Sequence, residues 1–332
     1  MRVEGALNPH PRGWARRDAT LQRVLARVLQ HSAVPSPRFG VGTATAVTLL
    51  LSVYPVVRLS TQTSVDRLAV RLAGMTAVTG LEQAIADTLL TLVPGSARDR
   101  AGNVTVSLGK GTPKRLVACA LDEVGYVVGN ITPDGYLTLR RVGAPPTALF
   151  DQQLEGQRVM VFGARGAVPG VGAVKSTHLT RGRPGGPAGP GAPDPVFTVD
   201  NAYVDVGATS AAEARALGID VLDPVAAAKR PHVYGDRLLA APVVGRRATC
   251  AALAAAVQAK PNVKGTVVAA FTVRSLYATK AGFQSLVKLQ GPFAEVKEPS
   301  LTARYADTPV ETVALKDADA LAQRLIAWME GR

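Results

Sequence analysis

Histidine and cysteine, the side chains most typical of zinc sites, are scarce in this sequence. They are His10, His31, His178, His232, Cys119 and Cys250. The histidines are far apart without HxxxH or HxxE spacing, and no Cys-x-x-Cys pair or Cys/His cluster occurs, so taken alone they predict no metal site. Both cysteines lie in apolar runs, and we expect them to be buried free thiols. The two cysteines therefore do not indicate whether the protein occupies a reducing or an oxidising compartment.

Aromatic and charged residues are also few, at 5% and 19%, whereas 47% of the 332 residues are apolar. This composition excludes a disordered chain and allows a full hydrophobic core. The formal net charge is +13, but eight arginines lie in residues 1–64, and no Lys/Arg run is interleaved with aromatics. Nucleic acid is therefore not an expected partner, and a solvated basic surface is the simpler interpretation.

The N-terminal region divides into a basic segment, 1–38, and an apolar segment, 39–57, that contains no charged residue. As a helix, the apolar segment would span about 28 Å, close to the hydrocarbon thickness of a bilayer. Basic residues before such a segment predict a signal-anchor or signal peptide, and hence a membrane-anchored or exported protein. A buried segment of a soluble protein, or a start codon assigned too early, remains the alternative. In that case the protein would be cytoplasmic.

In the rest of the chain, the residue pattern that predicts secondary structure changes twice. Residues 65–93 have helical spacing divided at Thr79-Gly80, and two strands follow within 99–128. Short alternating strands continue from 126 to about 206, interrupted by a Pro/Gly-rich loop at 181–195. Helical patterns then return and end in the amphipathic stretch "KDADALAQRLIAWMEG". The order predicts an α/β domain with a β insert.

Several motifs occur in an order that is specific to one family. They are "VACALDEVGYVV", "YVDVGATSAAEARALGIDVLDPV", "GDRLLAAPVVGRRATCAAL" and "RYADTPVETVALKDADALAQRLIAWME". In these the chain resembles the dinuclear-zinc tetrahedral aminopeptidases, the glutamyl-aminopeptidase-like enzymes of metallopeptidase family forty-two, over most of residues 65–332. The resemblance implies a three-layer α/β catalytic domain, 65–125 and 237–332, here truncated. It also implies an inserted β-barrel dimerisation-type domain, 126–236, and assembly into hollow dodecamers.

The positions that correspond to the family's metal site have lost their ligands. The resemblance places the first zinc-binding His on Ala120, the bridging Asp on Gly245, and the closing His on Asp307. The paired Glu residues, base and ligand, fall on Ser275 and Leu276. About thirty residues separate this pair from "RYAD", where the family has several times more, so a region that supplies a further ligand is expected to be missing.

Asp122, whose family counterpart orients the first His, loses that role when the His is absent. We expect it to form a salt bridge to Arg246 or Arg247. Two zinc ions cannot be held by Asp122 and Asp307 alone, so zinc, the family's cofactor, is not expected here. Ser275 has no nearby His and no G-x-S-x-G elbow, so we assign no catalytic residue.

The sequence therefore predicts a non-catalytic relative that serves as a structural or assembly component, or binds a peptide. Expected partners are copies of itself or another protein, a peptide ligand, and a membrane through residues 39–57. Arg246, Arg247 and Arg274 would favour an acidic ligand or a C-terminal carboxylate. The alternative from another class is an active metal-dependent aminopeptidase with a rebuilt metal site.

Overall fold

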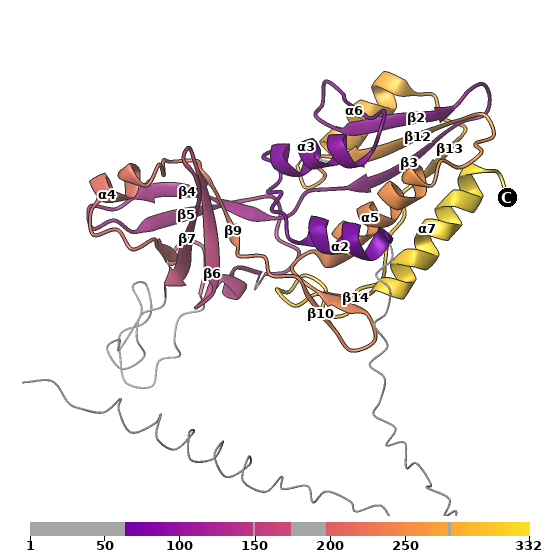
Figure 1. The fold of residues 1–332 in the computed structure, drawn as a ribbon. Coiled ribbons are helices and arrows are strands. Elements are labelled where there is room, and N and C mark those ends of the chain that lie inside the picture. Colours follow the sequence, from indigo (N-terminus) through magenta and orange to yellow (C-terminus); the bar gives the residue numbers. More distant parts are fainter. Residues whose placement is uncertain (1–63, 149, 174–196, 278–279) are drawn as a thin grey trace, which may run out of the picture. The chain divides into compact units, whose positions relative to one another are not determined.

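The computed structural model describes residues 64–148, 150–173, 197–277 and 280–332, which lie within one compact unit of residues 60–332 (Figure 1). Segments 1–38 and 39–57, His178 and the loop at 181–195 lie outside the described residues. Within the described ranges, no helix combines the length and the apolar character needed to cross a membrane.

The α/β part is built on a mixed five-stranded sheet. In spatial order its strands are β1 (Ala97–Arg98), β2 (Val104–Gly109), β12 (Thr266–Thr272), β3 (Lys114–Ala120) and β13 (Glu295–Lys297). β12 is antiparallel to β2 and parallel to β3, and β3 is parallel to β13. The parallel pair β3 and β12 is buried along almost its whole length, as expected for strands covered on both faces.

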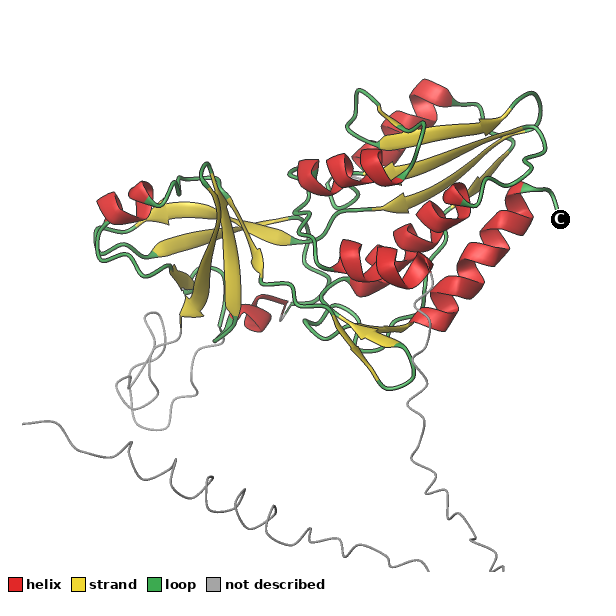
Figure 2. Ribbon diagram, viewed as in Figure 1, coloured by secondary structure: helices red, strands yellow, loops and turns green. Residues whose placement is uncertain are grey.

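Helices cover both faces of this sheet (Figures 1 and 2). The helices are α2 (Ser64–Ala73), α3 (Gln83–Leu92), α5 (Val244–Gln258), α6 (Ala281–Gln290) and α7 (Leu315–Met329). Side chains alternate along β12, so that Val267, Ala269 and Phe271 pack with α2, α3, α5 and α7, whereas Val268 and Ala270 pack with α6. The result is the three-layer arrangement expected from the sequence.

Helix α5 lies at the centre of the larger helical layer. Its run of alanines favours helix and presents little bulk, which suits close packing against α2 and α7. Cys250 of α5 is joined to Cys119 of β3 by a disulfide with a Cα–Cα distance of 5.6 Å. The expectation of free thiols was therefore wrong, because the fold brings together two cysteines that are separated by 131 residues in sequence.

A small antiparallel sheet lies beside α7. Its strands are β10 (His232–Tyr234), β11 (Leu238–Ala240) and β14 (Thr312–Ala314), with β11 in the middle. β14 leads directly into α7, so this sheet fixes the start of the last helix. The ring of His232 stacks on Tyr234 at an exposed position, and His232 belongs to no group of metal-binding side chains among the described residues.

A closed β-barrel occupies the chain between the two sections of the α/β part. In spatial order its strands are β4 (Gly125–Ile131), β5 (Leu137–Val142), β8 (Tyr203–Asp205), β7 (Gly166–Ala173), β6 (Arg158–Gly163) and β9 (Pro224–Ala227). The short helices η1 (Phe150–Leu154) and α4 (Ala211–Ala216) accompany it. Its interior is apolar, with Val128, Leu137 and Val204 fully buried. The predicted α/β fold with an inserted β-barrel is confirmed.

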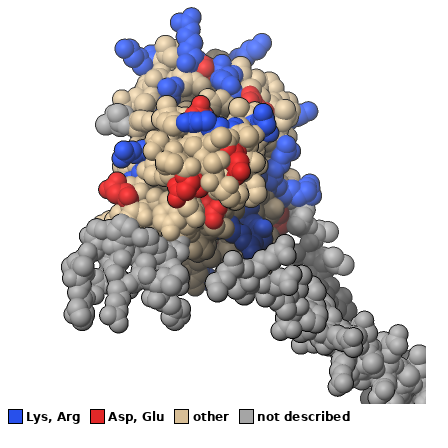
Figure 3. All heavy atoms as spheres, turned by 90° about the vertical axis from the view of Figure 1, so that its left-hand side faces the viewer, with Lys and Arg blue, Asp and Glu red and all other residues tan. Residues whose placement is uncertain are grey.

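One face of the molecule shows how its charges are distributed. In Figure 3, acidic side chains gather toward the middle of the face, and lysines and arginines project around them. A nucleic-acid surface requires a continuous basic patch that follows the phosphates. This face offers no such patch among the described residues.

Candidate functional site

The candidate site lies at the edge of the sheet where β3 and β12 end. Because these strands are parallel, their carboxyl ends meet, and Thr272 pairs with Ala120. The backbone N–H of Leu121 donates to the carbonyl of Thr272 at 2.8 Å, which fixes the two exits side by side. Helix α5 begins at Val244, and Arg246 in its first turn donates to the Asp122 carbonyl and to Ser275 Oγ, so this turn lies at the same edge. Segments separated by more than 100 residues therefore meet here.

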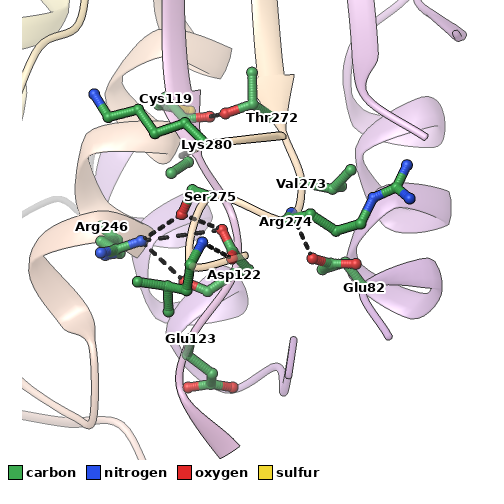
Figure 4. A network of polar contacts seen from close by, with 12 residues as sticks. Glu82, Cys119, Asp122, Glu123, Arg246, Thr272, Val273, Arg274, Ser275 and Lys280 are labelled. Carbon is green, nitrogen blue, oxygen red and sulfur yellow. Dashed lines mark hydrogen bonds and ion pairs between the residues drawn. The ribbon is translucent and has the colours of Figure 1, made fainter. Parts of the chain in front are cut away.

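Asp122 follows β3 and is fully buried at this edge. Its Oδ1 accepts a hydrogen bond from Ser275 Oγ, and its Oδ2 accepts one from the Leu276 N–H at 3.0 Å (Figure 4). Arg246 Nη1 lies 4.0 Å from Asp122 Oδ1 and donates to Ser275 Oγ at 2.9 Å. The predicted ion pair of Asp122 with Arg246 is confirmed, and both carboxylate oxygens have protein donors.

Gly245 lies against a carboxylate that the sequence interpretation did not identify. Glu311 Oε1 accepts from the Gly245 N–H at 2.7 Å, and Oε2 accepts from the Asp307 N–H at 3.1 Å. A Cβ at Gly245 would lie 2.8 Å from Glu311 Oε1, so a larger residue at this position would require the end of the Glu311 side chain to move. The glycine is thus matched to a buried acid that joins the start of α5 to the loop carrying Asp307. The signal was present in "RYADTPVE", four residues after Asp307.

A second buried group surrounds Glu123. Its carboxylate pairs with Lys229 and with Arg247 Nη2, the latter at 3.3 Å, and accepts from the Ala77 N–H at 2.8 Å. Burial alone would raise the pKa of Glu123, but the positive charges of Lys229 and Arg247 outweigh it and hold the pKa below its ordinary value. Lys229 is another residue that the sequence did not reveal.

Two of the three arginines expected to bind a ligand do not face the Asp122 edge. Arg247 is fully buried against Glu123, so it is inaccessible to a ligand. The Arg274 guanidinium donates to the Ala101 carbonyl and extends away from Arg246 (Figure 4). It lines a separate cavity of about 310 Å³ together with Glu82. Arg246 is the one of the three that remains at the candidate site.

A cavity of about 450 Å³ opens at this edge. It is lined by Ala120, Gly245, Arg246, Ser275 and Asp307. A smaller adjoining cavity of about 140 Å³ is lined by Leu276, and also by Arg246 and Asp307. The sequence positions assigned to the degenerate site therefore meet in space, with Asp122 buried behind the cavity wall.

These residues do not fit two zinc ions. Such ions require histidine nitrogens and several carboxylates, with an open position for water. Among the described residues, no group of three or more His, Cys, Asp and Glu side chains could hold a metal. Asp122 has protein donors on both oxygens, and the Arg246 guanidinium lies beside it, where a metal ion would meet a like charge.

Comparison with known proteins places this geometry in context. The family model for M42 glutamyl aminopeptidase matches residues 102–275. The chain is 32% identical to SgcX of Escherichia coli (strain K12), which is named as an aminopeptidase, over 184 residues, 53% of this chain and 46% of the relative. It is 29% identical to the lysyl aminopeptidase of Pyrococcus furiosus over 144 residues, 43% of this chain and 38% of the relative. The chain thus spans about half, or less, of the length of these curated relatives.

Solved structures show the same fold. The aminopeptidase APDkam598 of Desulfurococcus kamchatkensis superposes with a TM-score of 0.64 at 18% identity, covering 81% of this chain and 95% of that one. The TET1 peptidase of Pyrococcus horikoshii, described as assembling into a tetrahedron or a large octahedral shell, gives a TM-score of 0.62 at 19% identity and covers 80% and 99%. At these identities the likeness establishes the fold.

Proposed function

Since this chain belongs to the M42 glutamyl aminopeptidase family, we propose that it is a non-catalytic, peptidase-like member that acts by binding or assembly. The observation that carries the proposal is the burial of the Asp122 carboxylate and its bonding to protein groups. Its carboxylate, at the family's metal edge, is buried and bonded to Ser275, Leu276 and Arg246. The His that this carboxylate would orient in the family is replaced by Ala120, and a metal ion at this edge would have to overcome the charge of Arg246.

The contacts around the cavity support the same proposal. The ends of β3 and β12 and the start of α5 are the segments on which the resemblance places the zinc ligands. Here they are joined by the Asp122, Ser275 and Arg246 contacts, and Glu311 joins α5 to the Asp307 loop. The Cys119–Cys250 disulfide adds a covalent link between β3 and α5. Bonds within the chain thus hold together segments that metal ions would otherwise bridge.

We also propose that the protein is a homo-oligomer or part of a protein complex. The barrel is complete and closed, and a solved relative of the same fold is described as assembling into shells. Export or membrane tethering through residues 39–57 remains part of the proposal. The disulfide supports it, since disulfides persist mainly in oxidising compartments.

Metal analysis and a turnover assay on the same purified sample test the central claim. The full-length chain is loaded with zinc or cobalt, its metal content is measured, and hydrolysis of aminoacyl-anilides is followed. We expect neither stoichiometric metal nor turnover. Two tightly bound ions per chain, with turnover abolished by Asp122→Asn or Asp307→Asn, would instead establish the rival function, an active aminopeptidase with a rebuilt site.

Fractionation tests assembly and location separately. We expect the native protein in the membrane or exported fraction, with a mass by light scattering that corresponds to several chains and the Cys119–Cys250 link detectable by peptide mapping. A reduced monomer in the cytosolic fraction would contradict both assembly and export, but would leave the absence of catalysis untouched.

A further inference from the structure

Strand β13 lies at one edge of the five-stranded sheet (Figure 1). Its only sheet neighbour within the described residues is β3, to which it is parallel, with Val296 opposite Leu116. A strand at the edge of a sheet presents a row of unpaired backbone N–H and C=O groups to whatever lies beside it. The side of β13 that faces away from β3 can therefore accept a further strand.

The backbone groups of Val296 are the ones that face away from β3. Along a strand these groups alternate between the two sides, and on β3 the Leu121 N–H donates to β12, whereas the Lys114 carbonyl accepts from the Ala294 N–H at 2.7 Å. The even-numbered residues of β3 thus bond toward β13. In a parallel ladder, Leu116 bonds to the two residues that flank its partner, so Val296 itself points its N–H and C=O outward.

The sequence of β13, Glu-Val-Lys, is complementary to itself when two copies run antiparallel. A two-fold axis at Val296 places Glu295 opposite the partner's Lys297, and Lys297 opposite the partner's Glu295. The outward N–H and C=O of Val296 then form the reciprocal hydrogen bonds of an antiparallel pair. Opposite charges directly across a sheet stabilise the pairing, whereas parallel pairing in the same register would place like charges together.

The two charged side chains of β13 are available for this pairing. Glu295 accepts from the Trp328 Nε1–H at 2.7 Å, and the Lys297 Nζ lies 5.1 Å from the centre of the Trp328 ring. Neither side chain forms an ion pair within the described ranges. Trp328 of α7 therefore holds both side chains on one face of the edge and leaves each charge without a counter-ion.

The opposite face of β13 carries apolar surface that a second copy would cover. Val296 shares this face with Leu116, which is buried in the cluster that includes Leu286 of α6, but Val296 is 45% exposed. Leu289, three residues further along α6, is 58% exposed. Burial of such side chains adds an apolar contribution to the charge pairing on the other face.

We propose that β13 pairs antiparallel with β13 of a second copy of this chain, so that the sheets of the two chains form one continuous sheet. A two-fold pair uses the same edge of both chains and closes after two copies. Pro299, two residues beyond the strand, has no N–H and confines the pairing to this short segment. The inference rests on the assembly part of the proposed function and names the surface that carries it.

Light scattering of full-length Glu295→Lys and Lys297→Glu tests the pairing. Each variant alone places two like-charge pairs across the axis, and we expect its dissociation constant for pairing to rise at least about tenfold. An equimolar mixture of the two variants restores two opposite-charge pairs and should recover the wild-type mass. Mixing cannot restore a side chain that is needed only within its own chain. Failure of the mixture to recover would therefore overturn the proposed register.

Two further variants separate the charges from the backbone. Lys316→Glu is the matched control, because it makes the same charge change about 18 Å from Trp328 along α7 and should leave the mass unchanged. Val296→Pro removes an N–H that faces away from β3, so it should abolish pairing while the chain still folds. Thermal unfolding at a concentration where the wild type also dissociates verifies folding of each variant. Pairing that survives Val296→Pro would refute the proposal.

The measured masses also separate this inference from the proposed function. An oligomeric wild type whose mass is unchanged in both single variants refutes the β13 interface alone and leaves the proposed assembly standing. A monomeric wild type refutes the interface and the homo-oligomer together. A monomer that binds a different protein through this edge, with binding lost in Val296→Pro, refutes self-pairing and assigns the edge to that protein.

Discussion

The barrel and the cavity edge of the α/β part differ in the number of charged side chains that they bury. The barrel interior is apolar, and its buried Asp151 is bonded to the Tyr126 hydroxyl at 3.0 Å and to the partly exposed Arg141 at 2.6 Å. The cavity edge buries many more charges. These are Asp122, Glu123, Glu311, Lys229 and Arg247.

Under the proposed non-catalytic function, this difference marks the cavity edge, and not the barrel, as the part of the fold that has changed. An apolar barrel core is stabilised by burial of its side chains and needs no metal. A peptidase metal edge gathers acids around cations, and its acids become costly when the metals are lost. In this chain Lys229, Arg246 and Arg247 provide positive charge to the remaining acids. We infer that these cations now stabilise the cavity edge. The following experiments test the contrast between this edge and the barrel.

The largest expected effect is at Glu123. Glu123→Gln leaves Lys229 and Arg247 buried without a counter-charge, and breaking such a pair costs about 3–5 kcal/mol. Asp151→Asn in the barrel is the comparison, because Arg141 can turn to solvent, and we expect about 1–2 kcal/mol. Unfolding in urea measures both. Equal losses in the two variants would remove the proposed distinction between the regions.

The disulfide should contribute next. Cys119→Ser combined with Cys250→Ser is expected to reduce stability by about 2–4 kcal/mol, since the link restricts a loop of 131 residues in the unfolded chain. A reductant should lower the unfolding midpoint of the wild type toward that of the double variant and leave the double variant unchanged. A wild-type midpoint insensitive to reductant under unfolding conditions would contradict the link.

The sequence predicted those features that depend on pattern within one segment. Apolar runs identified strands such as Lys114–Ala120, and the order of motifs identified the barrel insert. The positions Ala120, Gly245, Ser275 and Asp307 were also found from motifs, and the fold brings them to one cavity. Each of these inferences needs local sequence and a known order of elements.

Pairings between distant segments were not predictable in this way. Two cysteines in separate apolar runs give the same local signal whether free or bonded. Lys229 lies 106 residues from Glu123 in a stretch without a motif, so its charge appeared solvated. Arg247 and Arg274 appeared equivalent to Arg246 in sequence, but the helical turn buries Arg247, and the exit of β12 directs Arg274 to another cavity.

Lowering the pH should reduce the difference in the free energy of unfolding between the wild type and Glu123→Gln. The pKa of Glu123 is lowered by Lys229 and Arg247, so its contribution is present above the ordinary value of 4.5 and is lost as pH falls through the lower folded value. Unfolding measured over this range should show the two proteins converging at low pH. A difference that stays constant below pH 4.5 would show that the ionisation of Glu123 is not what stabilises the edge.

The smallest effect on the free energy of unfolding is expected at Glu82. The pH dependence of its contribution has the opposite sign to that of Glu123. Burial raises the pKa of Glu82, although its Oε1 accepts hydrogen bonds from the N–H groups of Gly80 at 2.9 Å and Arg274 at 2.7 Å. Ionisation therefore opposes folding, so the stability associated with the protonated form is present below 4.5 and is lost as pH rises through the higher folded value.

Glu82→Gln keeps an oxygen for both N–H groups and removes the charge, so unfolding at neutral pH should show no loss, or a small gain. Glu82→Ala is the matched control, because it leaves two partly buried donors without this acceptor and should cost about 1 kcal/mol. If Glu82→Gln were as damaging as Glu82→Ala, the charge of Glu82 would be a stabilising counterpart to the edge cations. The cavity edge would then be a single network in which every acid, including this one, depends on Arg247 and its neighbours.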